Sequence, residues 1–296
     1  MISVIISSVN KDYLKKVSEN IADTIGVPFE IIAIENREDP RGICEVYNRG
    51  IQQAKYNMLC FAHEDITFKT NNWGSMVLQL FADHPDYGLF GVAGSDYKSL
   101  APSGWNGSGT DTDYSNIIQN FKFQDKKDFH YYKNYDNKKI AQVVCIDGVW
   151  FCAPKKIAEE VMFDEDVFKG FHAYDLDFSF AVARKYKVGV TFDILIDHFS
   201  EGNFDRTWLE EILKFHKKWN HHLPVNLRPF PRNTSLSTEK HTFQYFIDRL
   251  IHFKLPISTA FKVLYMNNNF RKLDTWLFLK LHYYIIKKGL RAKSSL

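Results

Sequence analysis

The sequence predicts an α/β fold in which helices cover both faces of a doubly wound, mostly parallel sheet. Short apolar runs alternate with stretches whose apolar residues recur at helical spacing. This alternation is typical of strand, helix, strand units built on a parallel sheet. An apolar run in 57–68 (NMLCFAHEDITF) also ends abruptly in imidazole and carboxylate side chains. The carboxyl ends of strands are where open α/β sheets bind ligands.

The first part of the chain follows this rhythm closely. Apolar runs predict strands at Ile2–Ser7, Phe29–Glu35, Met58–Ala62 and Tyr87–Ala93. Between them, apolar residues at helical spacing predict three helices, which include Leu14 to Ile25, Ile43 to Ala54 and Trp73 to Phe81. Gly26 and Pro28 end the first of these helices.

The rhythm breaks in 94–139, which is polar and shows no clean period. We expect an irregular insertion there, on the acceptor or lid side of the site or as a surface excursion. Beyond it, strands are predicted at Ile140–Ile146, Val149–Cys152 and Val188–Asp193, and helices from Pro154 to Val161, from near Tyr174 and Asp175, and from Trp208 to Trp219.

The domain organisation follows from these elements. We expect a catalytic domain over 1–223, a linker over 224–239 with three prolines in Pro224–Pro231, and a basic extension of two or three helices over 240–296.

Composition indicates a globular protein, with 45% apolar and 25% charged residues. Aromatic residues reach 16%, which fits a thick core, sugar-stacking surfaces or both. The net charge is only +3, but 240–296 holds eleven Lys and Arg against two Asp and Glu. That segment therefore carries +9, and the rest of the chain carries −6. Such a basic segment indicates an acidic partner.

For the partner of 240–296, two interpretations stay open: a helical hairpin packed on the catalytic domain, or contact with an anionic membrane surface. Nucleic acid is disfavoured, because the aromatic residues are interleaved with aliphatic ones. The membrane interpretation uses an aromatic set and a basic set, which are Trp276, Phe278, Tyr283 and Tyr284, and Lys280, Lys287, Lys288 and Arg291.

The four cysteines show neither a CxxC pair nor zinc-finger spacing with histidine. We expect Cys44, Cys60, Cys145 and Cys152 to be buried free thiols in a reducing cytoplasm. The chain starts directly with a strand, without the basic and long apolar regions of a secretion signal. No apolar run is long enough to span a bilayer. The expected location is cytoplasmic, with peripheral contact at the inner face of the cell membrane.

Polar residues at the predicted strand ends are the candidates for chemistry. Asp65 and His198, with His63 as a further candidate, suit Mn²⁺ or Mg²⁺ holding a diphosphate. Asp175 is a candidate general base for a hydroxyl group. Simpler interpretations stay open as well: Asp175 as a helix N-cap with Asp177 in the first turn, and His198 as a hydrogen-bonded histidine at a strand end.

Five segments in this order resemble the family 2 type glycosyltransferases of the GT-A fold. They are ISVIISSVN, RGICEVYNRGIQQAKYNMLCFAHED, VVCIDGVWFCAPKKI, FDEDVFKGFHAYDLDFSFAVARKYKVGV and DHFSEGNF. The sequence is most similar to a bacterial branch associated with capsule and other surface polysaccharides, whose metal motif reads His-x-Asp. The resemblance covers about residues 2–205.

The resemblance implies roles for particular residues. The nucleotide would be held by Ser7, Ser8, Glu35, Asn36 and Arg41. Asp65 would bind the metal, His198 would complete its site, and His63 stands where the family has its first Asp. Glu64, between them, is expected to be a bystander. Asp147, Gly148 and Tyr174 would face sugar and acceptor. Tyr174 and Asp175 match the family's Glu-Asp pair, so that Asp175 is the base and Tyr174 replaces the first acid.

The implied activity is inverting transfer of a sugar from a nucleoside diphosphate sugar, with UDP expected, to a hydroxyl group of a glycan or lipid-linked acceptor. Two alternatives stay open. A nucleotidyltransferase would need a Gly-rich, Lys-containing phosphate loop after the first strand, where this chain has SSVNKDYLKK. A catalytically inactive binding or scaffold protein would explain the departures at His63 and Tyr174.

Overall fold

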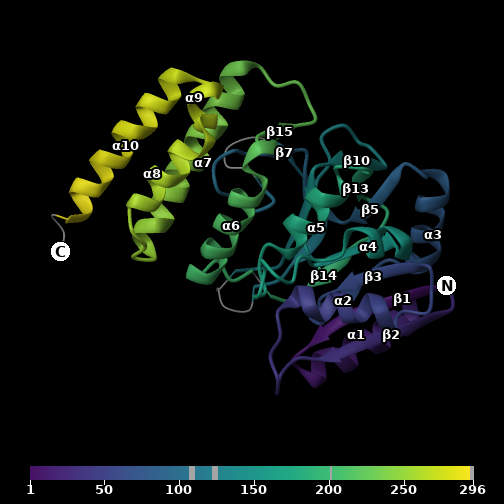
Figure 1. Ribbon diagram of the computed structural model, residues 1–296. Coiled ribbons are helices and arrows are strands. Elements are labelled where there is room, and N and C mark those ends of the chain that lie inside the picture. The colour runs from purple at the N-terminus through teal and green to yellow at the C-terminus, as the bar shows by residue number, and fades with distance from the viewer. Residues whose placement is uncertain (107–110, 122–125, 201, 294–296) are drawn as a thin grey trace.

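The computed structural model describes residues 1–106, 111–121, 126–200 and 202–293, with side chains described as far as Leu290 (Figure 1). The main sheet has the order β10 (Ile140–Val143), β13 (Lys187–Thr191), β5 (Tyr87–Gly91), β12 (Trp150–Pro154), β3 (Met58–Ala62), β1 (Ile2–Ser8) and β2 (Phe29–Glu35). β1 pairs in parallel with β2 and β3, and β5 pairs in parallel with β13. In contrast, β12 is antiparallel to both β3 and β5, and β10 is antiparallel to β13. The carboxyl ends of β1, β2, β3, β5 and β13 therefore lie at one edge, together with the amino end of β12.

Helices cover both faces of this sheet (Figure 1). Side chains alternate between the two faces of a strand. On β1, Val4 and Ile6 lie in a buried cluster with residues of α1 (Lys11–Thr24) and α3 (Trp73–Asp83). Ile5 lies instead in the cluster that includes residues of three helices on the other face, α2 (Ile43–Gln53), α4 (Lys155–Val161) and α5 (Tyr174–Val182). The predicted α/β fold with a doubly wound, mostly parallel sheet is confirmed.

The segment 94–139, predicted to be irregular, instead contributes strands to a second sheet. This sheet has the order β11 (Cys145–Ile146), β6 (Ala93–Ser95), β8 (Asp113–Gln119), β14 (Ile196–His198) and β4 (Ile66–Phe68), with β9 (Phe129–Lys133) paired to β8. The buried polar side chains of β8 are hydrogen-bonded internally: Ser115 donates to the Tyr131 carbonyl, and Asn116 donates to the carbonyls of Phe192 and Ile194. Because these satisfied polar residues replace apolar ones, β8 shows no hydrophobic alternation.

The second sheet also places His198 next to the end of β3. His198 was expected just beyond a strand, but it is the last residue of β14. In the sheet register His198 lies opposite Ile66 on β4 and opposite Gln119 on β8. Since Ile66 directly follows Asp65, this register brings together residues that are more than a hundred positions apart in the sequence.

The C-terminal extension forms a helical unit at one end of the molecule (Figure 1). After α6 (Arg206–Trp219), η1 (Asn220–His222) and β15 (Val225–Asn226), which pairs with β7 (Tyr97–Lys98), the chain enters α7 (Arg232–His252), α8 (Ser258–Tyr265), η2 (Met266–Asn268), α9 (Asn269–Leu273) and α10 (Thr275–Lys293). Helix α7 begins inside the stretch predicted as linker. Its first turns are polar, so the sequence shows no apolar helical period there. In the part of the chain that the structure describes, no helix has the length and apolar content needed to cross a bilayer.

Helix α7 is anchored to the α/β part of the chain through Glu239, which is fully buried. Its carboxylate accepts hydrogen bonds from the hydroxyl group of Tyr97 and from the backbone N–H groups of Leu100 and Ala101. A buried carboxylate requires such donors, so this contact fixes the start of the extension against the 97–101 loop.

The expectation of four free thiols is wrong for two of them. Cys60 on β3 and Cys152 on β12 form a disulfide, whereas Cys44 and Cys145 are free and buried. The physical reason is register: β3 and β12 are antiparallel neighbours, and Cys60 lies directly opposite Cys152, with Cα atoms 4.2 Å apart. Such pairing depends on a contact between residues distant in the sequence, which spacing along the chain does not show.

Candidate active site

A cleft of about 820 Å³ opens at the edge where the strands of the main sheet end. Its wall includes all of the residues that the sequence marked for metal binding and catalysis. These are His63 and Asp65 after β3, Asp147 and Gly148 before β12, Tyr174 and Asp175 at the start of α5, and His198 at the end of β14. The convergence follows from the strand directions, because β12 runs against its neighbours and so starts where they end.

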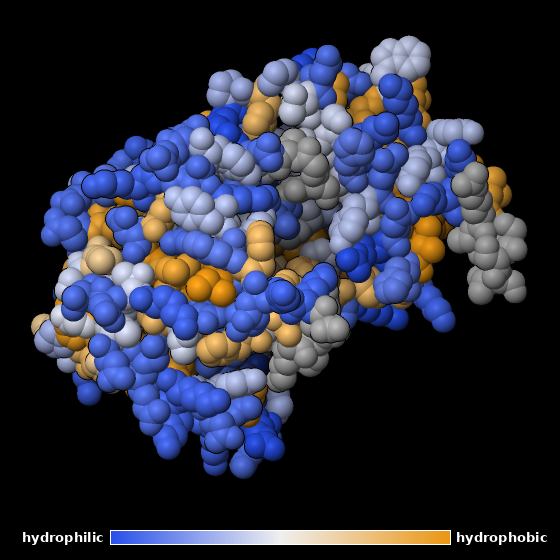
Figure 2. All heavy atoms as spheres, turned by 180° about the vertical axis from the view of Figure 1, so that it is seen from behind, coloured by the Kyte–Doolittle hydropathy of each residue, from blue (hydrophilic) through white to orange (hydrophobic). Residues whose placement is uncertain are grey.

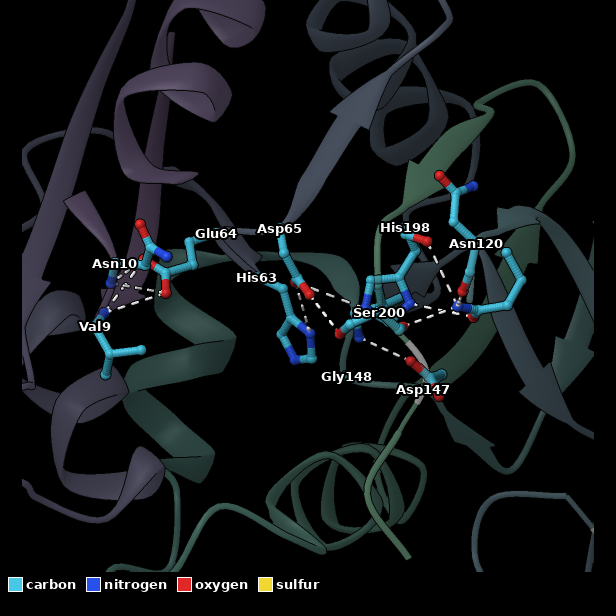
Figure 3. Close-up of polar contacts among 12 residues, drawn as sticks. Val9, Asn10, His63, Glu64, Asp65, Asn120, Asp147, Gly148, His198 and Ser200 are labelled. Carbon is cyan, nitrogen blue, oxygen red and sulfur yellow. Dashed lines mark hydrogen bonds and ion pairs between the residues drawn. The ribbon is translucent and has the colours of Figure 1, made fainter. Parts of the chain in front are cut away.

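His63, Asp65 and His198 form a compact group (Figure 3). Asp65 Oδ1 lies 3.9 Å from His63 Nδ1 and 3.6 Å from His198 Nε2. One ligand atom from each residue lies within 4.8 Å of the other two. Ser200 donates a hydrogen bond of 2.6 Å to the other Asp65 oxygen. Two imidazoles and one carboxylate at these distances suit a divalent transition-metal ion, and imidazole ligands favour Mn²⁺ over Mg²⁺.

The side chains around Asp65 favour its ionised form. Burial raises its pKa, but the His63 and His198 rings and the Ser200 hydroxyl group outweigh burial, and the pKa of Asp65 lies below its usual value. Burial lowers the pKa of His63, although Asp65 opposes this shift. A neutral imidazole beside a carboxylate is the state that binds a metal ion.

Asp175 lies in the opposite electrostatic environment. Burial, with a further contribution from the Asp147 carboxylate, raises the pKa of Asp175 to about 7. Its Oδ2 accepts a hydrogen bond of 2.9 Å from the Gly148 N–H. Asp147 has a pKa above its usual value because it is buried, and its Oδ1 accepts from the Val149 N–H. Asp175 is thus held in place and titrates near neutral pH.

The N-cap interpretation of Asp175 is wrong. The N-cap of α5 is Ala173, which has a left-handed backbone with φ of 61° and no side-chain cap. Asp175 sits in the first turn, and its side chain is directed to Gly148. Asp177 turns away to Lys218 and Trp219, where it has a structural role.

Of the five residues expected to bind the nucleotide, two line the cleft and three do not. Ser7 and Asn36 line the cleft. Ser8 is fully buried and donates its hydroxyl proton to Glu64. The Arg41 guanidinium pairs with Asp39 and Glu45, outside the cleft wall. Glu35 accepts from the Arg37 N–H and also lies outside that wall. Ser8, Glu35 and Arg41 are therefore not among the residues that the fold brings to the cleft.

Glu64, expected to be a bystander, connects two strand ends. Its carboxylate accepts from the Ser8 hydroxyl at 2.8 Å and from the N–H groups of Val9 and Asn10. Figure 3 shows Glu64 turned toward Val9 and Asn10, away from the His63 and Asp65 side chains. A carboxylate there complements the N–H groups at the start of α1 and fixes the end of β1 to the end of β3.

Other lining residues could not be assigned from the sequence. Gln119, at the end of β8, contacts His198 through its side-chain oxygen, 3.3 Å from Nδ1. Aromatic side chains form much of the remaining wall; they are Tyr13, Tyr47, Trp105, Phe121, Phe129, Tyr131, Phe171, Phe204 and Trp208. The high aromatic content of the sequence was consistent with such a wall, but it could not identify which aromatic residues form it.

Residues 3–222 match a family described as "Glycosyltransferase like family". The chain belongs to this family. A comparison with curated proteins found no match.

The chain is also similar to solved structures, two of which are described here. The crystal structure of GalNAc-T7 with UDP, GalNAc and Mn²⁺ has a TM-score of 0.48 and 10% sequence identity, covering 74% of this chain and 48% of that chain. This chain therefore spans about half the length of that one. The structure of S. aureus TarS 1-349 in complex with UDP-GlcNAc has a TM-score of 0.45 and 11% identity, covering 88% of this chain and 75% of that chain.

Proposed function

We propose that the protein is an inverting, metal-dependent glycosyltransferase. It moves a sugar from a nucleoside diphosphate sugar to a hydroxyl group of a glycan or lipid-linked acceptor, in the synthesis of capsule or another surface polysaccharide. UDP-sugars are the donors to test first. The observation that carries this proposal is that Asp175 and the group of His63, Asp65 and His198 line the same cleft.

The part of the cleft formed by His63, Asp65 and His198, which we call its metal end, explains how the diphosphate could bind. None of the described lining residues is a lysine or an arginine. A diphosphate bound there therefore needs a cation, and His63, Asp65 and His198 have the donor types and spacing to hold it. A divalent ion at this position supplies charge stabilisation for the departing nucleotide. Ser7, Asn36 and Tyr13 of α1 also line the cleft, and we expect them to contact the nucleoside.

The part of the cleft around Asp175, which we call its base end, explains how the acceptor hydroxyl group could be activated. Asp175 removes the proton from the acceptor hydroxyl group as that oxygen bonds to the anomeric carbon and the bond to the diphosphate breaks. The Gly148 N–H fixes one Asp175 oxygen, and the other oxygen is the one that we expect to accept the proton. The displacement is a single step, so the configuration inverts and no protein nucleophile is required. Aromatic residues of the wall, such as Trp105 and Phe171, provide apolar surfaces for sugar rings.

A donor screen tests this function. We expect one nucleotide sugar among UDP-, GDP- and dTDP-sugars to raise the melting temperature with Mn²⁺ and not with EDTA, since a ligand at a hundred times its Kd adds about 2.7 kcal/mol. The same donor should release nucleoside diphosphate when incubated with the protein. Absence of both effects for every donor would indicate a scaffold protein. Formation of a nucleoside triphosphate and a sugar 1-phosphate from the nucleotide sugar and added pyrophosphate would indicate nucleotidyl transfer. Each result contradicts the proposal.

We also propose that α10 docks on an anionic membrane surface, at the inner face of the cell membrane. One face of α10 is buried through Leu277, Leu281 and Ile285. The opposite face exposes Trp276 (73%), Leu279, Tyr283 (65%) and Ile286, at spacings of three and four residues. Figure 2 shows apolar side chains interrupting the hydrophilic surface at this end of the molecule.

The charge on α10 favours a bilayer over a second copy of the chain. Lys280 and Lys287 are exposed beside the apolar stripe, and Thr275–Lys293 contains no Asp or Glu. Self-association through this face would bring like charges together, whereas an anionic bilayer complements them. Of the residues that indicated this contact from the sequence, Phe278 is buried, and the side chain of Arg291 lies outside the described residues.

Vesicle sedimentation tests the membrane proposal. We expect binding to vesicles of phosphatidylcholine with phosphatidylglycerol at low salt, and little binding at high salt or to phosphatidylcholine alone. The double variant Trp276→Ser, Tyr283→Ser should lose this binding. The matched control Tyr245→Ser, an exposed tyrosine of α7, should keep it. No binding of the unmodified protein at low salt would contradict the proposal, as would dimerisation that requires Trp276 and Tyr283.

A further inference from the structure

The two positions at which this chain departs from the pattern of the family it resembles are in direct contact. His63 follows β3 and Tyr174 opens α5, 111 residues further along the chain. His63 Nε2 lies 3.0 Å from the Tyr174 hydroxyl oxygen. Both side chains line the cleft. The contact therefore links the metal end of the site to the helix that carries Asp175.

The Tyr174 hydroxyl group also lies 3.1 Å from the carbonyl oxygen of Gly148, to which it donates. A phenol has one proton to donate, and a carbonyl oxygen only accepts. The neighbouring Tyr47 hydroxyl group is a further hydrogen-bond partner of Tyr174. With its own proton donated to Gly148, the Tyr174 hydroxyl group accepts from His63 through its oxygen. His63 Nε2 therefore carries the proton, and His63 Nδ1 keeps its lone pair.

The Nδ1 atom defined in this way faces Asp65. It lies 3.9 Å from Asp65 Oδ1, which is too long for a hydrogen bond and suitable for two atoms that share a cation. On the other side of Asp65, His198 Nδ1 is 3.3 Å from Gln119 Oε1. The Gln119 amide is oriented by donation from its Nε2 to the carbonyls of Asn120 and Ser200, so its oxygen is the atom that faces His198. His198 then donates from Nδ1, and its Nε2 is directed to Asp65.

The two histidines are thus held in opposite tautomers, each with its unprotonated nitrogen toward Asp65. We propose that the Tyr174 hydroxyl group is a positioning group that fixes His63 in the Nε2–H tautomer and so makes His63 Nδ1 a ligand of the divalent cation. This inference rests on the proposed function, because it requires a cation at Asp65. Hydrogen-bond partners of metal-bound histidines have this orienting effect generally.

Gly148 is part of the same arrangement. A Cβ atom at this position would lie 2.2 Å from the Tyr174 hydroxyl oxygen, so a glycine is required for the hydroxyl group to reach its place. The Gly148 carbonyl accepts from Tyr174, and the Gly148 N–H donates to Asp175. One glycine therefore orients both Tyr174 and the base. The Tyr174 residue acts through His63 and Gly148, not on the reacting atoms.

The test combines a spectroscopic measurement with Mn²⁺ binding. In the metal-free protein, nitrogen NMR of ¹⁵N-labelled histidine should show His63 protonated at Nε2; protonation at Nδ1 would overturn the inference without any variant. Electron paramagnetic resonance should then show Mn²⁺ affinity reduced about 10–100-fold in Tyr174→Phe, the usual effect of losing such a partner. The control Tyr114→Phe removes a buried hydroxyl group that donates to Asp96, outside the cleft, and should bind Mn²⁺ normally.

A double variant separates this inference from the proposed function. If Tyr174 acts through His63, Tyr174→Phe should weaken Mn²⁺ binding no further once His63→Ala is present. Normal Mn²⁺ affinity in Tyr174→Phe, or additive losses in the double variant, would overturn the inference and leave the metal site at Asp65 intact. If the unmodified protein binds no Mn²⁺, the metal assignment of the proposed function fails, and the ligand role of His63 fails with it.

Discussion

Asp65 and Asp175 are both largely buried carboxylates on the wall of one cleft, yet their pKa values move in opposite directions. Burial acts to raise both. At Asp65 it is outweighed by two imidazole rings and the Ser200 hydroxyl group, whereas at Asp175 it is reinforced by the Asp147 carboxylate. The comparison shows that the neighbours of a carboxylate, more than its depth in the protein, decide the direction of its pKa shift.

The largest expected effect comes from removing the base end alone. Asp175→Asn keeps the size of the side chain and removes its ability to accept a proton, so turnover should fall about 10²–10⁴-fold. Mn²⁺-dependent binding of the donor should be unchanged, because Asp65 is untouched. Steady-state kinetics with the donor found by the screen measures this; turnover within a few fold of the unmodified protein would remove Asp175 from the mechanism.

The second largest effect is expected in the pH dependence of catalysis, which should follow the titration of Asp175 and not that of Asp65. A base must be unprotonated to act, so with a pKa of about 7 at Asp175 the value of kcat/KM should rise about tenfold per pH unit below 7 and level off above it. Asp65, with a lowered pKa, is already ionised throughout this range. A profile that is flat between pH 5.5 and 8 would contradict this division.

A smaller effect is expected from the hydroxyl group that supports Asp65. Ser200→Ala removes the hydrogen bond to Asp65 Oδ2 and should weaken Mn²⁺ binding by about tenfold, the lower end of the range for such partners. Ser200→Thr keeps the hydroxyl group and serves as the control. The midpoint of the pH profile should stay in place in both variants; a shifted midpoint would mean that the two ends of the cleft are not independent.

The sequence predicted those parts of the fold that depend on local pattern. The apolar runs Phe29–Glu35 and Met58–Ala62 are strands with the predicted bounds, and α5 begins at Tyr174 as expected. The order of the polar residues at the predicted strand ends was enough to predict that His63, Asp65, Asp175 and His198 line one cleft.

What the sequence did not predict depends on pairing between distant segments. β8 was missed because its buried side chains are polar and satisfied by the backbone of other strands. The Cys60 to Cys152 disulfide and the place of His198 opposite Gln119 follow from strand register, which no local pattern encodes. The role of Glu64 likewise required knowing that the ends of β1 and β3 are neighbours.

The most direct test of the central claim is calorimetry of UDP binding, with and without Mn²⁺, on matched amide variants of the two carboxylates. Asp65→Asn should lose the Mn²⁺-dependent part of UDP affinity, whereas Asp175→Asn should retain it. Equal losses in both variants, or no loss in Asp65→Asn, would contradict the assignment of cation binding to Asp65 and proton transfer to Asp175.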